Sequence, residues 1–479
     1  MPNIPLHKRK STAIFLLLAL SLIYFREFLT PAKMIYGSDW LLSIFTSRLS
    51  RINYVKNFKT LPLWDGFNFS GHPTAATTGG GSLVYPLHIL QYIFPVYFGW
   101  TVLYITHIFL AGLGMWFLLR SYKLSLLSSL IGAVVFMFAG QIISTTQGGH
   151  QSRTIAGMML PFAFLFIHRA MDSKRITDFI IFGGITGLLM LAGHPQICYW
   201  GMIAVFAYFI SEFFWQRKTY DNRDIPKTLL SSAAGFLVLF LIVSISVLPP
   251  ILALSYGVRG AVKGYSYTTS WSMPTSEILN LIFPHFSGIL ENYWGENPFK
   301  LDSRYLGILP LILLGFSFFY RENKKLVKFF AFFTAVSLIL ALGKNTPLFR
   351  IYYYLIPMAK KFRAPTMFFF LTTFGICVLS GFGTEALLKL KNEKYKEEKK
   401  NVFIYLGILT GTILLFAIIV SLGDKSILSW MKSHFANNWS GIISREGIQQ
   451  KIYLMNMNFT NFKKSLWIST LLITVNGAL

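Results

Sequence analysis

The stretch LLSSAAGFLVLFLIVSISVLPPI, from Leu229 to Ile251, decides the fold class of this chain. It runs for 23 residues without a charged side chain, and a helix of about 20 apolar residues can cross the hydrocarbon core of a bilayer. Runs close to this length recur along the chain. With 54% apolar, 17% aromatic and 13% charged residues, the composition is that of a membrane protein. The sequence therefore predicts an all-α polytopic membrane protein.

We predict a bundle of about 11 to 12 transmembrane helices from the lengths of the apolar runs. Pro86 and Pro95 interrupt a further apolar stretch at 83–100, which favours a re-entrant or interfacial segment there. The whole of 1–479 reads as one integral-membrane domain. The predicted spans are 11–29, 100–119, 124–143, 154–167, 176–192, 197–214, 229–251, 305–320, 326–342, 367–388, 402–422 and the shorter run 466–475.

Every second connection between spans is rich in Lys and Arg, and basic connections mark the cytoplasmic side of a membrane. Lys8-Arg9-Lys10 precedes the first span, so the N-terminus is predicted to be cytoplasmic. The unusual Gly, His, Pro and acidic clusters all fall on the opposite side, where we expect the active site. That external side receives the loops 30–99, 255–304, 343–365 and 423–464, with short turns at 144–153 and 193–196.

The chain is strongly basic, with a formal net charge of +25. No compact soluble basic module is present to bind nucleic acid, so nucleic acid is not an expected partner. Basic cytoplasmic connections account for about half of the Lys and Arg residues. The others lie in external loops, where anionic head groups of the bilayer or a lipid phosphate are the available partners. Cys198 and Cys377 lie inside predicted spans, so they indicate no disulfide framework.

The first external loop contains a stretch with helical periodicity. Ser38 is placed to cap this helix, and Asp39 would lie in its first turn, where the helix dipole favours a carboxylate. The pattern predicts an amphipathic helix that lies along the membrane surface. Its apolar residues are Leu41, Ile44, Phe45, Leu49, Ile52 and Val55, and its more polar side carries Arg48, Arg51, Lys56 and Lys59.

Two acidic residues of this loop are candidates for chemistry. Asp39 is a carboxylate held at a membrane surface, able to accept a proton from a hydroxyl or to orient it. The alternative is that Asp39 only helps to cap the helix. Asp65, in Leu63-Trp64-Asp65-Gly66, is a weaker catalytic candidate, because Asp is also common in turns.

A series of short motifs lies on the predicted external side. They are Gly37-Ser38-Asp39, Pro62-Leu63-Trp64-Asp65, Phe69-Ser70-Gly71-His72-Pro73, Tyr85-Pro86, Gly149-His150-Gln151, Ala192-Gly193-His194-Pro195-Gln196, Tyr305-Leu306-Gly307 and Lys361-Phe362-Arg363-Ala364-Pro365-Thr366. In this order, the motifs resemble the YfhO-like family of bacterial membrane proteins, which is related to the GT-C class of integral-membrane glycosyltransferases. The resemblance covers roughly 36–383, and larger members of the family extend beyond the end of this chain.

This resemblance implies a GT-C-like bundle whose large first external loop carries amphipathic surface helices. It also implies a glycosyltransferase that uses a polyprenyl-phosphate-linked sugar donor at the outer face of a bacterial cytoplasmic membrane. The acceptor would be a glycan, lipid or protein of the cell envelope. Asp39 matches the first-loop aspartate of the family, which implies that it is the catalytic carboxylate.

Displacing a lipid phosphate from a sugar requires cations that stabilise the departing charge. Lys360, Lys361 and Arg363 stand just outside the tenth predicted span, at the level of a lipid phosphate, and are our candidates for donor phosphate binding. Arg153 and Arg304, each at the external start of a span, are weaker candidates. For all five residues the alternative is that they anchor the end of a span.

External His72, His150 and His194, with Gln196, are candidates for substrate contact. Hydrogen bonding at loop turns is the alternative for the histidines. Their spacing matches no zinc site, so no metal ligand is assigned and no cofactor is predicted, although a divalent cation that supports the leaving phosphate stays open.

The loop at 255–304 combines aromatic residues with Glu277, Glu291, Glu296 and Asp302, a combination that suits sugar stacking and hydroxyl binding. An aromatic belt at the membrane interface is the alternative. Glu291 and Asp302 are reserve candidates for a catalytic acid.

Two rival functions are a transporter or flippase of lipid-linked precursors and a non-catalytic envelope assembly factor. Transporters place ionisable groups near the middle of spans, whereas here His107 and few others lie there. The enzyme interpretation is therefore favoured.

Overall fold

A computed structural model describes residues 6–66, 70–76, 84–146, 148–221, 223–254, 264–390, 392, 395–440 and 443–478. Parts of the first-loop motifs, at 67–69 and 77–83, and the start of the second large loop, at 255–263, lie outside the described residues. The chain divides into two compact units. Unit 1 comprises Met1–Met137 and Thr145–Val262, and unit 2 comprises Phe138–Ser144 and Lys263–Leu479.

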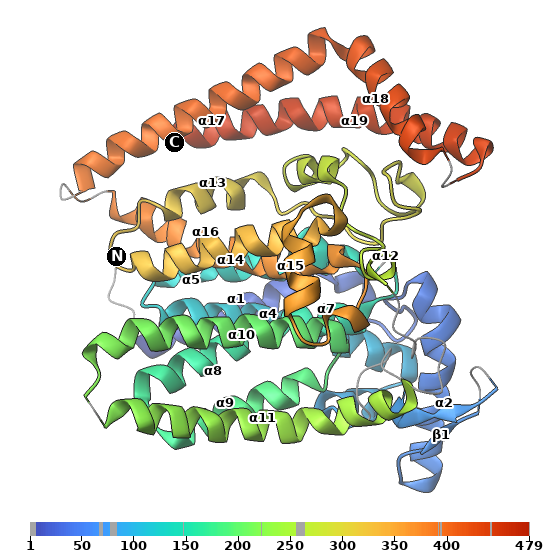
Figure 1. Ribbon diagram of the computed structural model, residues 1–479, viewed down its shortest axis with the longest axis vertical. Coiled ribbons are helices and arrows are strands. Elements are labelled where there is room, and N and C mark those ends of the chain that lie inside the picture. The colour runs from blue at the N-terminus through green and yellow to red at the C-terminus, as the bar shows by residue number, and fades with distance from the viewer. Residues whose placement is uncertain are drawn as a thin grey trace. The chain divides into compact units, whose positions relative to one another are not determined.

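Unit 1 is built from long helices and a small amount of extended structure (Figure 1). A two-residue antiparallel ribbon pairs Trp64 with Pro73 and Asp65 with His72. The elements are α1 (Leu6–Tyr24), α2 (Phe45–Phe58), β1 (Trp64–Asp65), β2 (His72–Pro73), α3 (Leu90–Ile93), α4 (Val96–Ser121), α5 (Leu126–Met137), α7 (Gln151–Met158), α8 (Leu160–Ser173), α9 (Ile176–Met190), α10 (Pro195–Gln216) and α11 (Asp224–Leu254).

Unit 2 contains the remaining helices, joined by several 3-10 turns (Figure 1). The turns cover Thr275–Leu281, Leu290–Asn292, Gly343–Asn345, Ala359–Lys361 and Pro365–Phe368. The helices are α6 (Gly140–Ser144), α12 (Tyr265–Thr268), α13 (Ile308–Ser317), α14 (Lys324–Ala341), α15 (Leu348–Leu355), α16 (Phe369–Lys389), α17 (Lys396–Leu422), α18 (Asp424–Trp439) and α19 (Arg445–Ala478).

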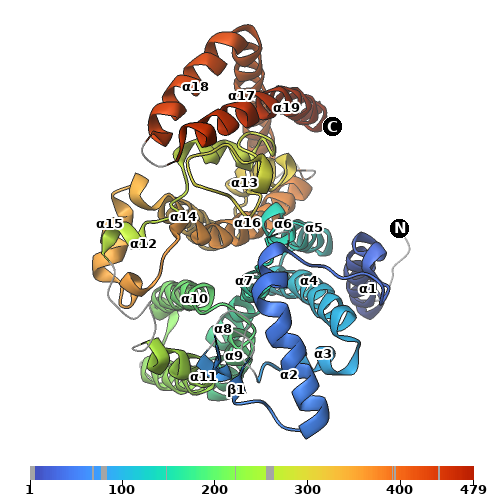
Figure 2. The same cartoon turned by 90° about the vertical axis from the view of Figure 1, so that its right-hand side faces the viewer.

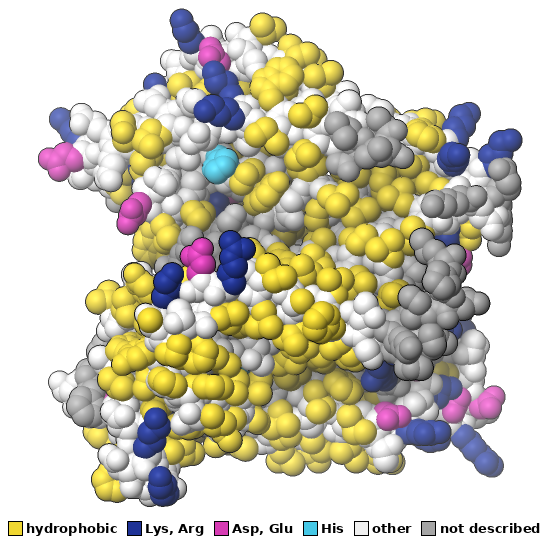
Figure 3. All heavy atoms as spheres, turned by 180° about the vertical axis from the view of Figure 1, so that it is seen from behind, with side chains coloured by type: hydrophobic (Ala, Val, Ile, Leu, Met, Phe, Trp, Pro, Cys, Tyr) yellow, Lys and Arg dark blue, Asp and Glu magenta, His cyan; other side chains and the backbone are white. Residues whose placement is uncertain are grey.

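The predicted all-α membrane fold is confirmed. Each predicted span coincides with a helix, and seven helical segments of the described chain are long and apolar enough to cross a membrane. Three shorter apolar helices, Lys10–Tyr24, Ile176–Met190 and Ile308–Ser317, match three further predicted spans. On the face drawn in Figure 3, hydrophobic side chains cover a broad area, as a surface in contact with lipid requires. The seven are Val96–Ser121, Leu126–Ser144, Ser152–Ser173, Pro195–Thr219, Asp224–Ala253, Pro365–Lys389 and Lys396–Leu422.

Small residues let helices approach closely in both units. In unit 1, a Cβ on Gly183 of α9 would lie 2.1 Å from the carbonyl oxygen of Gly235 in α11. In unit 2, a Cβ on Gly383 of α16 would meet the Leu313 carbonyl of α13. Apolar side chains gain little from leaving lipid for another apolar surface, so close backbone packing of this kind holds membrane helices together.

The predicted first-loop helix forms as α2, but the prediction that Arg48 and Arg51 lie on its exposed polar side is wrong. Figure 2 shows α2 beside α3 and α4, and Arg48 and Arg51 are buried in unit 1 instead of lying on its polar surface. Lys56 remains exposed. Arg48 faces inward because Gln91 of α3 and His88 of the preceding turn receive its guanidinium group. Helical periodicity separates the two sides of a helix but does not reveal such partners.

The stretch at 423–464, predicted as a loop before a short final span, is mostly helical. α18 occupies Asp424–Trp439, and α19 begins at Arg445, well before the predicted run 466–475. Polar side chains in the first half of α19 bind backbone atoms of unit 2, as described below, so this part is stabilised without a continuous apolar surface.

The orientation in the membrane is a prediction that cysteine labelling can check. We expect single cysteines at exposed Lys56 and Glu291 to react with an impermeant thiol reagent in intact cells, since both loops are predicted to be external. A cysteine at exposed Lys218 should react only after the cells are opened. Protection of either external position would contradict the alternating basic pattern on which the orientation rests.

Candidate functional site

The candidate site in unit 1 centres on Asp39 and His150. The Oδ2 atom of Asp39 lies 3.0 Å from Nε2 of His150, and the two side chains are 53% and 34% exposed. A carboxylate beside an imidazole can accept a proton, and the imidazole can orient it or stabilise its charge. The Asp39 carboxylate is open to an incoming molecule, whereas the His150 Nε2 atom that faces it is buried. The structure therefore brings together two sequence candidates that are far apart in the chain.

Backbone contact between two glycines holds this pair. A Cβ on Gly37 would lie 2.1 Å from the backbone nitrogen of Gly149, so the two chain segments meet without side chains between them. Gly149 also has φ = +80°, which favours glycine. Asp39 follows Gly37 by two residues, and His150 directly follows Gly149. The motifs Gly37-Ser38-Asp39 and Gly149-His150 thus act as one structural unit.

The capping alternative for Asp39 is not what the structure shows. Asp39 precedes a π-helical turn, Trp40–Ile44, that leads into α2, and its side chain makes no capping hydrogen bond. Ser38 already lies inside the helical segment rather than before it. The carboxylate is directed to His150 instead.

Asp65 and His72 serve the local structure of the first loop. Asp65 is buried, and its carboxylate accepts a hydrogen bond from Ser47 of α2. His72 lies across the ribbon, with Nε2 4.0 Å from the Asp65 carboxylate. The pair therefore fastens the ribbon to α2. The Asp65 carboxylate is therefore shielded from solvent, whereas the Asp39 carboxylate is exposed.

Three further candidates cluster around the start of α7 and α10. His194 is the residue that precedes α10, and Gln196 is buried in its first turn. Arg153 is half-buried in α7. A Cβ on Gly193 would lie 2.6 Å from the Ser152 carbonyl of α7, so the turn that carries His194 packs against the helix that follows His150.

The predicted phosphate-binding cations lie in unit 2 on an exposed surface rich in tyrosine. Lys360, Lys361 and Arg363 are all exposed. The Lys360 ammonium lies 5.4 Å from the ring centre of Tyr353, and the Arg363 guanidinium lies 5.7 Å from that of Tyr267. Cation–π contacts of this kind orient the cations without neutralising them. The surface can therefore attract an anion.

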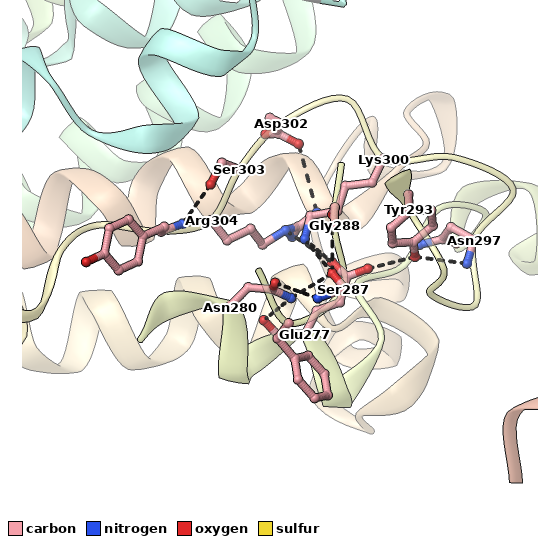
Figure 4. Close-up of polar contacts among 12 residues, drawn as sticks. Glu277, Asn280, Ser287, Gly288, Tyr293, Asn297, Lys300, Asp302, Ser303 and Arg304 are labelled. Carbon is pink, nitrogen blue, oxygen red and sulfur yellow. Dashed lines mark hydrogen bonds and ion pairs between the residues drawn. The ribbon is translucent and has the colours of Figure 1, made fainter. Parts of the chain in front are cut away.

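Glu277 is the centre of a buried ionic cluster in unit 2 (Figure 4). Its Oε2 atom lies 3.4 Å from both the Lys300 ammonium and the Arg304 guanidinium, and the Tyr293 hydroxyl donates to its Oε1 at 2.7 Å. Burial lowers the pKa of Lys300 to about 8, an effect that Glu277 opposes. Glu277 is only 1% exposed. The expectation that it binds a sugar hydroxyl is therefore wrong.

Asp302 and Arg304 belong to the same cluster. Asp302 is buried, accepts a hydrogen bond from Gln141 of α6 at 3.1 Å and lies 4.0 Å from Arg304. Both residues thus have partners that suit a structural role. This weakens the case for Asp302 as a catalytic acid and for Arg304 as a phosphate ligand. Glu291, in contrast, is exposed in the turn Leu290–Asn292 and remains accessible.

Lys451 of α19 also contacts this loop. Its ammonium donates hydrogen bonds to the carbonyl oxygens of Gly295 and Asn297, and the Asn458 side chain donates to the Asn292 carbonyl at 2.8 Å. Sequence reasoning missed this contact. Lys451 and Asn458 are about two turns apart on the same face of α19, in a polar segment that precedes an apolar run. This spacing is the signal that could have indicated a buried polar face.

No metal site is assigned. Among the described residues, no group of three or more His, Cys, Asp or Glu side chains is placed to hold a metal ion.

Comparison with solved structures gives a structural likeness at low sequence identity. No family model and no curated protein matches the chain. Among solved structures, the arabinofuranosyltransferase AftD from Mycobacteria, determined by single-particle cryo-EM, matches with a TM-score of 0.42 and 12% sequence identity. The match covers 79% of this chain and 26% of that chain, so this protein spans about a quarter of the length of that enzyme.

Proposed function

We propose that this protein is an integral-membrane glycosyltransferase. It moves a sugar from a polyprenyl-phosphate-linked donor to a cell-envelope acceptor on the outer face of the bacterial cytoplasmic membrane. The observation that carries the proposal is the exposed Asp39 carboxylate beside His150, with facing atoms 3.0 Å apart. The family resemblance of the motifs that hold this pair adds the donor class.

The transfer step can be written with Asp39 as the general base. The acceptor oxygen forms a bond to the anomeric carbon of the sugar, and the bond from that carbon to the phosphate oxygen breaks. The lipid phosphate leaves with the electron pair, and the acceptor proton passes to the Asp39 carboxylate. His150 is a positioning residue, because it fixes the direction of that carboxylate.

The polar groups in the middle of the bundle support an enzyme over a transporter. The Nδ1 atom of His107 lies 2.6 Å from the Leu103 carbonyl, and its Nε2 atom lies 2.7 Å from the Tyr85 hydroxyl. Both ring nitrogens are therefore engaged inside unit 1, as expected for a structural histidine. A transport site needs ionisable groups that face a pathway.

The direct test uses purified protein in vesicles with a panel of sugar-linked polyprenyl phosphates. We expect transfer to a cell-envelope fraction, read out as release of free polyprenyl phosphate that stops when Asp39 is replaced. Failure of every donor in the panel, with correctly inserted protein, would contradict the proposal. Movement of intact donor across the vesicle without sugar release would favour the flippase.

The exposed cations give a separate prediction. We expect the triple variant Lys360→Gln, Lys361→Gln and Arg363→Gln to raise the KM for donor several-fold, about 3- to 10-fold, because a lipid phosphate is attracted less strongly to the surface. Arg363→Lys should show a smaller effect, since the surface keeps this charge and still attracts the anionic lipid. Lys56→Gln, an exposed cation of unit 1, is the control. An unchanged KM would leave the three residues as span anchors.

A further inference from the structure

Two buried arginines in unit 1 have no role in the chemistry described so far. Arg48 and Arg51 lie one turn apart on α2, and they are only 4% and 8% exposed. The Arg48 guanidinium donates to Gln91 Oε1 at 3.2 Å and lies 3.4 Å from His88 Nε2. It also packs 5.7 Å from the ring centre of Trp100. Neither arginine has an acid within ion-pair distance among the described residues.

The neighbourhood of these arginines is rich in donors and poor in acceptors. Buried N–H groups usually have hydrogen-bond partners, and an unpartnered group points to something that the protein alone does not supply. Trp40 packs against Trp100 in a tilted arrangement with ring centres 5.1 Å apart, which places both indoles in the same cluster. Four side chains of the cluster have buried nitrogens without a partner in the described chain: Trp40 Nε1, Arg51 Nε and Nη1, Gln91 Nε2 and Trp100 Nε1.

The net charge of the cluster is positive, which suits an anion, as its unpartnered N–H donors do. Asp65 is the acid whose charge acts on Arg51, but its carboxylate is engaged by Ser47. Burial, and then repulsion from Arg51, lower the pKa of Arg48 to about 9. Burial lowers the pKa of Arg51 as well. Arginine guanidinium groups keep their charge in proteins at neutral pH. Two buried guanidinium groups with one nearby carboxylate leave an excess of positive charge, which an anion would neutralise.

We propose that Arg48 and Arg51, together with Gln91, bind a phosphate group, and that this phosphate belongs to the lipid-linked donor. Guanidinium groups suit phosphate because their planar N–H groups match its oxygens. A sugar-linked polyprenyl phosphate is a diester with one negative charge, which balances the excess charge of the cluster. Trp40, whose buried indole belongs to the cluster, directly follows Asp39 in the chain.

The assignment of this phosphate to the lipid-linked donor rests on the proposed function, whereas the phosphate site itself does not. Binding can therefore be measured without sugar transfer. The probes are a polyprenyl monophosphate, the matching polyprenol without phosphate, and inorganic phosphate. Binding of each to the purified full-length protein in detergent is measured by native mass spectrometry and by the shift in thermal unfolding temperature.

We expect Arg51→Gln and Arg48→Gln each to weaken polyprenyl phosphate binding about tenfold or more, as the loss of charge-assisted hydrogen bonds predicts. Arg51→Lys should bind with intermediate strength. Lys56→Gln, on the exposed side of the same helix, should bind like the parent. Without ligand, Arg51→Gln should unfold at the same temperature as the parent or higher, because it removes a buried charge that lacks an ion-pair partner. A purely structural arginine would give the opposite shift.

The outcomes separate the site from the donor. Binding of the lipid that survives both arginine substitutions would overturn the site and leave the donor class standing. Equal binding of polyprenyl phosphate and polyprenol by the parent, without binding of inorganic phosphate, would overturn the inference and also count against a lipid-phosphate donor. Arg51-dependent binding of inorganic phosphate alone would support the phosphate site and overturn its assignment to the lipid.

Discussion

Replacing Asp39 with Asn is expected to lower the rate of sugar transfer by about two orders of magnitude or more, the usual contribution of a general base. Asn keeps the size of the side chain and can still hydrogen-bond to His150, but it cannot take up the acceptor proton. The side chain is largely exposed and makes no capping hydrogen bond, so the fold should not depend on it. The rate is measured as release of polyprenyl phosphate from a sugar-linked donor at saturating acceptor.

Two further variants show whether the loss is specific. Glu27→Gln removes another exposed acid near the start of the first loop and should leave the rate unchanged. His150→Gln should lower the rate less than Asp39→Asn, because His150 positions the base without accepting the proton itself. If Asp39→Asn protein with a normal unfolding temperature transferred sugar at the parental rate, Asp39 would have no part in the mechanism. The exposed Glu291 would then be the next acid to test.

The largest loss of stability is expected from Glu277→Gln. This change leaves Lys300 and Arg304 buried without their shared carboxylate. Breaking a buried ion pair by removing one partner typically costs about 3–5 kcal/mol, because a charge stays buried without compensation. We expect a marked fall in the thermal unfolding temperature and in the yield of folded protein. The measurement is thermal unfolding in detergent, followed by intrinsic tryptophan fluorescence.

A matched substitution in the same loop controls for this effect. Glu291→Gln removes an exposed acid from a nearby turn and should change the unfolding temperature little. The double variant Glu277→Gln with Lys300→Met should recover part of the loss, since it also removes one uncompensated charge. An unfolding temperature equal to that of the parent in Glu277→Gln alone would contradict the structural role of the cluster.

The helices of this protein could be predicted from sequence because lipid imposes a simple length and composition rule. The run from Leu229 to Ile251 lies within α11, and the other predicted spans likewise coincide with helices. The rule fails for the first half of α19. There, Lys451 and Asn458 gain stability from backbone carbonyls instead of from lipid, and no hydropathy pattern reports such contacts.

The candidate site could be predicted only in part. Asp39 and His150 were both identified as candidates, but their pairing depends on the approach of Gly37 to Gly149, which sequence separation conceals. The direction of Arg48 was predicted wrongly for a related reason. A polar residue on an amphipathic helix faces water unless another element offers it partners, and here Gln91 and His88 do so.

The anchoring of the 290–300 loop by α19 has a consequence for the order in which the protein matures. A ribosome makes the Gly295 and Asn297 carbonyls long before it makes Lys451, which binds them. During that interval the loop must wait on the membrane surface with this contact unmade. Nascent chains released just before Lys451 should therefore hold this loop in a protease-sensitive form, whereas chains that include Asn458 should protect it. Completion of unit 2 is thus timed by the synthesis of α19.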